Sequence, residues 1–390
     1  MKADELRIVG SSQTNVVMEA ELTRICLRAL NRRPPKLRKE GLGQLVMPFD
    51  PELAWAAVSY LRTPTRVVWD VARSKATRLE PLYDGLYDDL VADPRALWRD
   101  GDSISVEARR MDSFAAGERQ VVGTVKNAII EAARRRGARL HVDPDAATVR
   151  WVARLDERDE LVLSIDLGGG SLAHRGWRRE AGDAPLREHL AAVLLMLARF
   201  DPRHDVLVDP MCGAGTIPIE AVHAARGTPR PTPFLEPLGL ARAKAAPLWP
   251  DATPFVIGCD LDLEVLRAAK DNARTAGVTG DVTLQRADAA SLSPELVADI
   301  ARERGRPLPR TGLILTNPPY GERLDEYDLT AVYHALAMSC RRFLHTGWRA
   351  GFLVGSPLLE DVFFKLIGPP RIKKPIANAN LRAYFYLYDL

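Results

Sequence analysis

The sequence has few of the residues on which metal sites and disulfide frameworks depend. Its 390 residues include four cysteines without a Cys-x-x-Cys pair, and seven histidines without a His-x-x-x-His or His-x-His spacing. These absences disfavour a zinc ribbon, a thioredoxin-type site and a helix-borne metal site. We therefore expect free thiols and no bound metal.

Long apolar runs are also missing. The longest, at 190–198, has nine residues, about half of the roughly 18 to 20 that a membrane-spanning helix requires. The first ten residues, MKADELRIVG, lack the basic start and the apolar stretch of a secretory signal. These absences predict a cytoplasmic protein without a membrane segment.

The composition is otherwise that of a globular protein, with 46% hydrophobic, 27% charged and only 7% aromatic residues. Wholesale disorder, collagen-like repeats and coiled-coil rods do not fit these fractions. A chain of 390 residues is long enough for two or three domains, each with its own core.

The net charge is only +3, but the charges are unevenly distributed. The stretch 24–39 has seven cations and no acid, and the stretch 371–382 has four cations and no acid. Such one-sign patches are typical of a surface that binds a polyanion. Solvated helix faces produce the same pattern, so both interpretations stay open.

The first part of the chain has an α+β pattern. Apolar residues at helical spacing predict a helix over 15–30, which the proline pair at 34–35 ends. Further helices are predicted over 53–61, 79–92 and 124–136, and strands over 65–71, 103–109, 147–155 and 160–167. We interpret 1–60 as a small N-terminal module, ferredoxin-like in part, and 61–167 as a second domain.

Residues 168–185 are polar and glycine-rich, which predicts a linker or hinge. Strands and helices then alternate, with strands predicted over 205–209, 254–260, 281–285, 311–317 and 350–355. Alternation of this kind predicts a Rossmann-like, doubly wound and mostly parallel α/β sheet over 186–390. Ligands of such sheets bind at the carboxyl ends of the strands.

A glycine-rich loop follows the strand at 205–209. Its sequence, DPMCGAGT at 209–216, lacks the third glycine of a dinucleotide fingerprint and begins with an acid that would repel a pyrophosphate. Gly213 and Gly215 leave room for a ligand close to the backbone. Asp209 suits the cationic amino group of a ligand, although a strand-end turn former is an equally good interpretation of this residue.

Two further strands are also followed by acids. Asp260 follows the strand at 254–260, where a carboxylate can accept both hydroxyls of a ribose, and Asp262 is placed to cap the next helix. After the third strand, Asp288 can take the amino group of an adenine. Three acids at three successive strand ends, with the glycine loop among them, predict a site for S-adenosylmethionine.

The motif Asn317-Pro318-Pro319-Tyr320 follows the apolar strand at 311–317. The Asn317 side-chain oxygen and the Pro318 carbonyl can accept the two hydrogens of an exocyclic amine and aim its lone pair at a methyl donor. Tyr320 offers a face on which an extruded base can stack. A simple proline turn or a polyproline ligand fits less well, because the motif follows a buried type of strand.

These motifs resemble a known family. DPMCGAGTIPIEA, GCDLDLEVLRAAKDNARTAGV and TNPPYGERL look like the motifs of the bacterial ribosomal RNA guanine-N2 methyltransferases, which carry a THUMP RNA-binding domain before a class I methyltransferase domain. The resemblance continues in SLAHRGWRREAGDAPLREHLAA, and more loosely in LRTPTRVVW and SISVEARRMDSF. It covers the chain from about Gly41 to its end, while Gly168-Gly169-Gly170 and His189 depart from the family pattern.

The resemblance implies roles for individual residues. It implies a THUMP domain at 61–167, a methyltransferase domain at 186–390, and base placement by Asn317, Pro318, Pro319 and Tyr320. It implies S-adenosylmethionine contacts by Asp209, Pro210, Cys212, Gly213, Gly215, Thr216, Asp260, Leu261, Asp288, Ala289 and Asn317. The candidates for contacts with RNA are Arg109, Arg110, Lys126, Arg175, Arg178 and Arg179. For the arginines at 175–179, solubility of the linker explains the sequence equally well.

The prediction that follows is methylation of the exocyclic N2 of a guanine in 23S ribosomal RNA. The same chemistry on tRNA is the nearest alternative, because THUMP-like domains also serve tRNA enzymes. A DNA adenine-N6 methyltransferase shares the amine site but does not explain the THUMP-like half. A non-catalytic RNA-binding assembly factor is the alternative from another class, although such a protein has no need of the cofactor loop.

An insertion at 227–251 separates the first strand of the α/β part from Asp260 and contains six prolines. It lengthens this connection well beyond the roughly 20 residues usual for the fold. A flap that covers the substrate and a passive surface loop are both compatible with it.

Overall fold

The computed structural model divides into two compact units, which we describe separately. The first comprises Met1–Gly10, Thr14–Leu172 and Pro229–Ala245, and the second comprises Ser11–Gln13, Ala173–Thr228 and Ala246–Leu390. The structure describes residues 2–109, 116–156, 158, 160–178, 186–242, 245–319, 326–378 and 381–390.

The first unit is built on one mixed sheet, whose described strands pair in the order β2-β3-β1-β4-β8-β7-β5-β6. The strands are β1 (Lys2–Val9), β2 (Arg38–Glu40), β3 (Gln44–Pro48), β4 (Arg66–Ser74), β5 (Ser103–Arg109), β6 (His141–Val142), β7 (Val149–Leu155) and β8 (Leu161–Asp166). This sheet runs through both of the N-terminal domains that the sequence suggests, 1–60 and 61–167.

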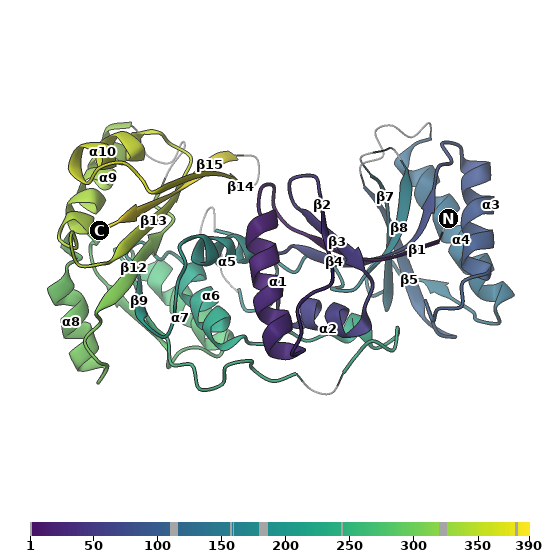
Figure 1. Ribbon diagram of the computed structural model, residues 1–390, viewed down its shortest axis with the longest axis horizontal. Helices are drawn as coiled ribbons and strands as arrows, with labels where there is room; N and C mark the ends of the chain where they lie inside the picture. Colours follow the sequence, from purple (N-terminus) through teal and green to yellow (C-terminus); the bar gives the residue numbers. More distant parts are fainter. Residues whose placement is uncertain are drawn as a thin grey trace. The chain divides into compact units, whose positions relative to one another are not determined.

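Helices cover this sheet in two pairs. Figure 1 shows α1 beside β3 and α4 beside β5; α2 packs on α1 and contacts β4, and α3 packs on α4 and also contacts β4. Asp50 begins α2 by accepting a hydrogen bond from Leu53 N–H at 2.9 Å, and Pro51 follows at the first helical position. The four helices are α1 (Asn15–Ala29), α2 (Pro51–Tyr60), α3 (Leu79–Val91) and α4 (Glu118–Arg135).

Alternation along the strands gives the first sheet one apolar row and one polar row. Leu6, Trp69, Ile165 and Trp151 lie opposite one another across four neighbouring strands, and all are buried. Strand residues one position along point to the other face. Asp70 lies on that face and has no exposed surface.

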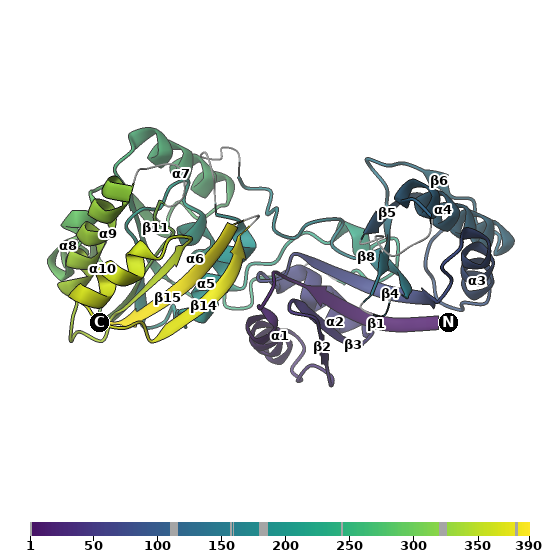
Figure 2. The ribbon, with the colours of Figure 1, turned by 90° about the horizontal axis from the view of Figure 1, so that it is seen from above.

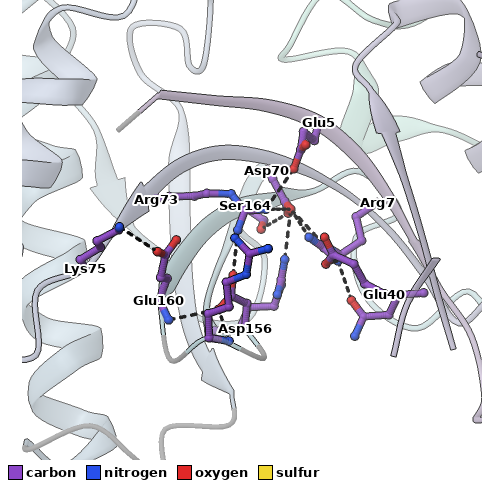
Figure 3. Close-up of polar contacts among 12 residues, drawn as sticks. Glu5, Arg7, Glu40, Asp70, Arg73, Lys75, Asp156, Glu160 and Ser164 are labelled. Atoms are coloured by element: carbon purple, nitrogen blue, oxygen red, sulfur yellow. Dashed lines mark hydrogen bonds and ion pairs between the residues drawn. The ribbon is translucent and has the colours of Figure 1, made fainter. Parts of the chain in front are cut away.

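Asp70 is the centre of a buried network of hydrogen bonds (Figure 3). Its carboxylate accepts from Arg7 Nε at 3.0 Å, from Arg154 Nη2 at 3.1 Å and from the Ser164 hydroxyl at 2.7 Å. Arg7 has no exposed side-chain surface and also pairs with Glu40. Because a buried charge is costly without partners, these bonds tie β1, β4, β7 and β8 to a single register.

The second unit is the predicted doubly wound sheet. Its strands pair in the order β11-β10-β9-β12-β13-β15-β14, parallel from β11 to β13 and antiparallel beyond. Figure 2 shows β14 and β15 side by side at one edge. The strands are β9 (Asp205–Asp209), β10 (Phe255–Asp260), β11 (Val282–Arg286), β12 (Thr311–Thr316), β13 (Arg349–Val354), β14 (Ile372–Asn378) and β15 (Leu381–Asp389).

Helices lie on both faces of the second sheet. In Figure 1, α8, α9 and α10 lie on one side, where Val297, Tyr333 and Phe363 join a buried cluster with strand residues such as Ile314 and Phe352. The helices α5, α6 and α7 lie on the other side. The six are α5 (Glu188–Leu197), α6 (Thr216–Arg226), α7 (Leu263–Thr275), α8 (Pro294–Glu303), α9 (Glu326–Arg341) and α10 (Leu358–Leu366).

Two segments behave differently from their prediction. Residues 173–178, which the sequence assigns to a linker, belong to the second unit, where Ala173 and Trp177 are buried. The segment Pro229–Ala245, the centre of the proline-rich insertion, belongs to the first unit although it leaves from and returns to the second. The average polarity of a segment does not reveal that a few of its side chains are buried. From the sequence, both segments are therefore predicted to be loops.

The insertion is fixed to the first unit by specific contacts. Arg230 donates from Nη2 to the Val58 carbonyl at 2.7 Å and also bonds the carbonyl of Leu61, so it satisfies backbone acceptors at the end of α2. The Phe234 ring, in the short 3-10 helix η1 (Pro233–Leu235), packs where Gly169 has no side chain. The segment is therefore part of the first unit's packing rather than a free loop.

No helix within the described ranges combines the length and the apolar character needed to cross a membrane. The four cysteines are all described, buried and free.

The fit between Gly169 and Phe234 predicts a large effect of a single methyl group. A Cβ at Gly169 would lie 1.8 Å from a Phe234 ring carbon, and the φ of +71° already requires glycine. We expect Gly169→Ala to lower the free energy of unfolding by about 2 to 4 kcal/mol, from backbone strain and overpacking together. Urea-induced unfolding measures this change.

Gly101→Ala is the matched control, because Gly101 has a φ of +84° and no heavy atom of the described chain within 4 Å of a Cβ. It should show the backbone cost of about 1 kcal/mol alone. In a Phe234→Ala background, Gly169→Ala should cost no more than this control. Equal effects of the two glycine substitutions in the native background would contradict the packing argument.

Candidate active site

The predicted functional residues follow strands that are neighbours in the second sheet. The strand β9 lies between β10 and β12, with Asp209 opposite Gly258 and Val208 opposite Ile314. Because the three strands are parallel, the residues that follow them meet at one edge of the sheet. Asp209, Asp260 and Asn317 therefore lie at the same carboxyl edge, as the sequence predicts.

The glycine-rich loop is held in place by its neighbours. Gly213 and Gly215 have φ angles of +52° and +84°, a region that glycine occupies without strain. Cys212 N–H donates to the Cys259 carbonyl at 2.8 Å, and the buried Asn272 side chain donates to the Ala214 carbonyl at 3.1 Å. The loop is thus fastened both to the end of β10 and to α7.

Asp260 stabilises this loop directly. Its Oδ2 accepts from Gly213 N–H at 3.0 Å, and its Oδ1 accepts from Asp262 N–H at 3.1 Å. Asp262 caps α7 by accepting from Glu264 N–H at 2.8 Å, which is the capping role that the sequence predicts for it. Asp260 is only partly buried, so a ligand can still approach its carboxylate.

Asp209 lies beneath the loop and is only 1% exposed. Its carboxylate accepts from Met211 N–H at 3.2 Å and interacts with the Thr316 hydroxyl. Burial raises the pKa of the Asp209 carboxyl to about 7, although both hydrogen bonds favour the ionised form. These contacts are those of the turn-forming interpretation, and a contact of Asp209 with a ligand stays a prediction.

The other predicted cofactor residues differ in exposure. Leu261 is 55% exposed at the end of β10, and Asp288 is exposed and caps the 3-10 helix η2 (Ala289–Ser291) through Ala290 N–H at 2.8 Å. Pro210, Cys212, Thr216 and Ala289 are buried around the loop and the strand ends. An exposed leucine beside carboxylates is the kind of apolar surface on which a base can rest.

The side-chain oxygen of Asn317 is buried just after the end of β12. Among the described residues, no hydrogen-bond donor reaches its Oδ1 atom. Pro318 is buried behind it, and the Tyr333 hydroxyl of α9 donates to the Pro319 carbonyl at 2.8 Å. The motif is therefore fixed by α9, while one amide oxygen remains available; Tyr320 lies outside the described residues.

Two arginines predicted to contact RNA have other partners. The side chain of Arg175 is 2% exposed and pairs with the buried Glu220 at 3.2 Å. Arg178 donates from Nε to Glu188 at 3.0 Å and from Nη2 to the Thr216 hydroxyl at 2.9 Å. Neither is available to an RNA phosphate as a surface cation would be, because both hold the 173–178 segment on α5 and α6.

The remaining RNA candidates lie in the first unit. Arg109 is exposed and pairs with Glu107 at 3.1 Å. Lys126, on α4, lines a cavity of about 340 Å³ together with Arg66, Arg150 and other residues. Arg110 and Arg179 lie outside the described residues.

Both cation-rich stretches find acids elsewhere in the fold. In the first, Arg32 pairs with Asp50 at 2.7 Å, and Lys39 pairs with Glu19 at 2.7 Å. In the second, Arg371 pairs with Asp389 at 3.0 Å. Acids that are distant in the sequence thus reduce the net charge of these surfaces, a contribution that a local count of charges misses.

Sequence reasoning missed the residues that support the site from behind. Asn272 and Tyr333 each bond one carbonyl of a site loop, and both side chains are fully buried. Asn272 stands in the DNARTAG stretch and Tyr333 in a helix of ordinary composition. A polar residue on an apolar helix face is the only signal that either leaves in the sequence.

The raised pKa of Asp209 predicts a pH dependence of stability. The folded protein binds this proton more tightly than the unfolded chain, whose carboxyl has a pKa near 3.8, so stability falls as pH rises from about 4 to 7. In Asp209→Asn this contribution is absent. We therefore compare the free energy of unfolding of the variant with that of the native protein. The difference, variant minus native, should increase by roughly 2 to 3 kcal/mol from pH 5 to pH 8.

Urea-induced unfolding of both proteins at pH 5, 6, 7 and 8 tests this expectation. A difference between them that stays constant over this range would mean that Asp209 is already ionised in the folded protein at pH 5.

A known protein family matches most of the second unit. Residues 175–366 match the family model described as "RMKL-like, methyltransferase domain". The match begins at the Arg175 segment and extends through the glycine loop, the acids and Asn317 to α10.

Curated relatives extend the similarity into the first unit. The protein named Ribosomal RNA large subunit methyltransferase K/L from Syntrophotalea carbinolica is 33% identical over 335 residues, covering 79% of this chain and 44% of that protein. Its namesake from Methylococcus capsulatus is 31% identical over 363 residues, covering 87% of this chain and 46% of the relative. The chain spans about half the length of the curated relatives it matches.

Solved structures show the same fold over the whole chain. The structure of SMU.472 complexed with SAH has a TM-score of 0.77 at 23% identity, covering 100% of this chain and 98% of that one. TrmN from Thermus thermophilus has a TM-score of 0.71 at 22% identity, covering 99% of each chain. Residues 175–366 thus belong to the RMKL-like methyltransferase domain family, and over most of its length the chain is similar to proteins named Ribosomal RNA large subunit methyltransferase K/L.

Proposed function

We propose that this protein is an S-adenosylmethionine-dependent RNA methyltransferase that modifies the exocyclic N2 of a guanine in 23S ribosomal RNA. The observation that carries the proposal is the buried Asn317 Oδ1 atom, which no donor of the described chain satisfies. A buried acceptor without a partner is costly, so its retention at a strand end favours a ligand that donates to it. An exocyclic amine is such a donor.

The residues at the carboxyl edge fit S-adenosylmethionine. The positive φ angles of Gly213 and Gly215 keep the loop backbone open to close approach, and Asp260 offers a partly exposed carboxylate to ribose hydroxyls. Leu261, 55% exposed, and Asp288 suit the face and the amino group of an adenine. When bound, the cofactor supplies an electrophilic methyl group on a sulfonium.

The chain's own contribution to the reaction is orientation. The Asn317 Oδ1 atom and the Pro318 carbonyl accept the amine hydrogens, so that the nitrogen lone pair leaves conjugation with the ring. Tyr333 keeps this turn fixed through its bond to the Pro319 carbonyl. No strong base is required, because a methylated ammonium loses its proton readily to water. Tyr320 is the residue that we propose for stacking with the extruded guanine.

The first unit is the proposed RNA-binding part, with a THUMP domain over 61–167. Arg109 is exposed, and Lys126 lines the cavity of about 340 Å³ with Arg66 and Arg150. Glu107 and Asp166 also line this cavity and pair with Arg66, so Lys126 and Arg150 are the cations that we propose for contacts with RNA phosphates there. The names of the curated relatives, ribosomal RNA large subunit methyltransferases, support ribosomal RNA as the substrate. A substrate of this kind implies a cytoplasmic location, which we propose with it.

Removal of the proposed amine acceptor should abolish most of the activity. We expect Asn317→Ala to lower the rate of methyl transfer to RNA by about 100-fold or more, because a misoriented amine rarely reaches attack geometry. Single-turnover incorporation of a labelled methyl group measures this rate. Glu303→Ala, an exposed site where α8 ends, is the control and should retain the native rate. A native rate in Asn317→Ala would exclude the proposed role of this residue.

The substrate is tested by nucleoside mass spectrometry of separated ribosomal RNA and tRNA from cells with and without the gene. We expect N2-methylguanosine to be lost from large-subunit RNA only, and to return when purified protein and S-adenosylmethionine are added to that RNA. Loss from tRNA alone would keep the chemistry and change the substrate. No change in either RNA would favour a binding factor without catalysis.

A further inference from the structure

Trp177 and Arg178 form a stacked pair of side chains, and Arg178 contacts Thr216 at the end of the glycine loop. The Arg178 guanidinium carbon lies 5.3 Å from the centre of the Trp177 ring. In the part of the chain that the structure describes, Trp177 Nε1 and Arg178 Nη1 are both buried and form no hydrogen bond. The side chain of Arg178 is 16% exposed, and Trp177 as a whole is 4% exposed.

The position of the free Arg178 nitrogen is fixed by the other two. Nε donates to Glu188 at 3.0 Å, and Nη2 donates both to the Leu186 carbonyl and to the Thr216 hydroxyl at 2.9 Å. Because a guanidinium is planar and rigid, these bonds also determine where Nη1 points. The arginine is thus held beside the start of α6 rather than extended into solvent.

Its neighbour Thr216 places this arginine at the loop assigned to the cofactor. Thr216 is the first residue of α6 and follows Gly215 directly. The helix α6 has eleven residues, and the amino end of such a helix carries partial positive charge. A guanidinium and an indole nitrogen also only donate. Glu188 takes up Arg178 Nε, but Nη1 and the indole nitrogen have no acceptor among the described residues, which favours an anionic oxygen.

We propose that Arg178, with Trp177 and the amino end of α6, binds the carboxylate at the amino-acid end of S-adenosylmethionine. The proposal rests on the proposed function, because it takes the loop at 209–216 as the cofactor loop. The burial of both donors favours a cofactor group enclosed in the protein over a phosphate of an RNA on the surface. Binding of the cofactor would also explain why Arg178 is held at Thr216 by a hydrogen bond, whereas Arg187 in the same segment is exposed.

The test compares two ligands that differ at this end. S-adenosylhomocysteine has the carboxylate, whereas 5′-methylthioadenosine keeps the nucleoside and the sulfur without it. By calorimetry, Arg178→Ala should raise the Kd of S-adenosylhomocysteine by about 10- to 100-fold, the range of a hydrogen bond to a charged group. The Kd of 5′-methylthioadenosine should change less than about threefold, since it makes no such bond.

A second variant keeps the test valid if Arg178→Ala does not fold. Trp177→Phe removes one donor and keeps the ring, so it should weaken S-adenosylhomocysteine by about 2- to 10-fold and leave 5′-methylthioadenosine unchanged. Arg187→Ala is the matched control, because Arg187 is an exposed arginine in the same segment. It should bind both ligands as the native protein does.

The alternative outcomes are distinct. Equal weakening of both ligands would mean that Arg178 only shapes the loop, and would overturn the proposal. Unchanged binding of S-adenosylhomocysteine with weaker RNA binding would overturn it in favour of an RNA phosphate. Native affinity in both variants would refute it while the proposed function stands. Absence of S-adenosylhomocysteine binding in the native protein would refute the proposed function together with this inference.

Discussion

The hydrogen bond from Gly213 N–H to Asp260 Oδ2, 3.0 Å long, joins the loop after β9 to the end of β10. The loop can reach this carboxylate because Gly213 and Gly215 adopt positive φ angles, so that the chain turns sharply before α6 begins. Parallel pairing then brings the end of β12, with Asn317, to the same edge. Each further feature of the site, from the buried Asp209 to the Arg178 contact at Thr216, depends on this loop geometry.

Buried polar groups at this edge divide into two kinds. Asp209, Asn272 and Tyr333 have partners within the chain, and they hold the loops in one conformation. Asn317 Oδ1 and Arg178 Nη1 have none among the described residues. Since an unsatisfied buried group costs about 1 to 3 kcal/mol, these two atoms are the ones at which we propose that a ligand completes the hydrogen bonding. One is an acceptor and the other a donor, in agreement with an amine and a carboxylate.

In the first unit, the central buried charge has partners within the chain and stabilises the fold. The acceptors of Asp70 are taken up by Arg7, Arg154 and Ser164, and such a network fixes strand register rather than offering a site. The insertion Pro229–Ala245 adds to the same unit through Arg230 and Phe234. A segment encoded between two strands of the second unit is therefore part of the first, so the boundary between the units is not a single point in the sequence.

The doubly wound sheet, the glycine loop and the acids at the strand ends follow from the sequence, because strand and helix periods and glycine in a tight turn are local properties. The cap at Asp262 was recognisable for the same reason. The burial of Arg175, the anchoring of 173–178 and the place of the insertion depend on partners such as Glu220 and Gly169, which are distant along the chain. Local composition describes such segments as polar loops, since an ion pair or a ring packed over a glycine exists only once the elements have met. The order of residues therefore determined the fold class. Only the packing of the folded chain decided whether an arginine such as Arg175 is an exposed cation or a buried member of an ion pair.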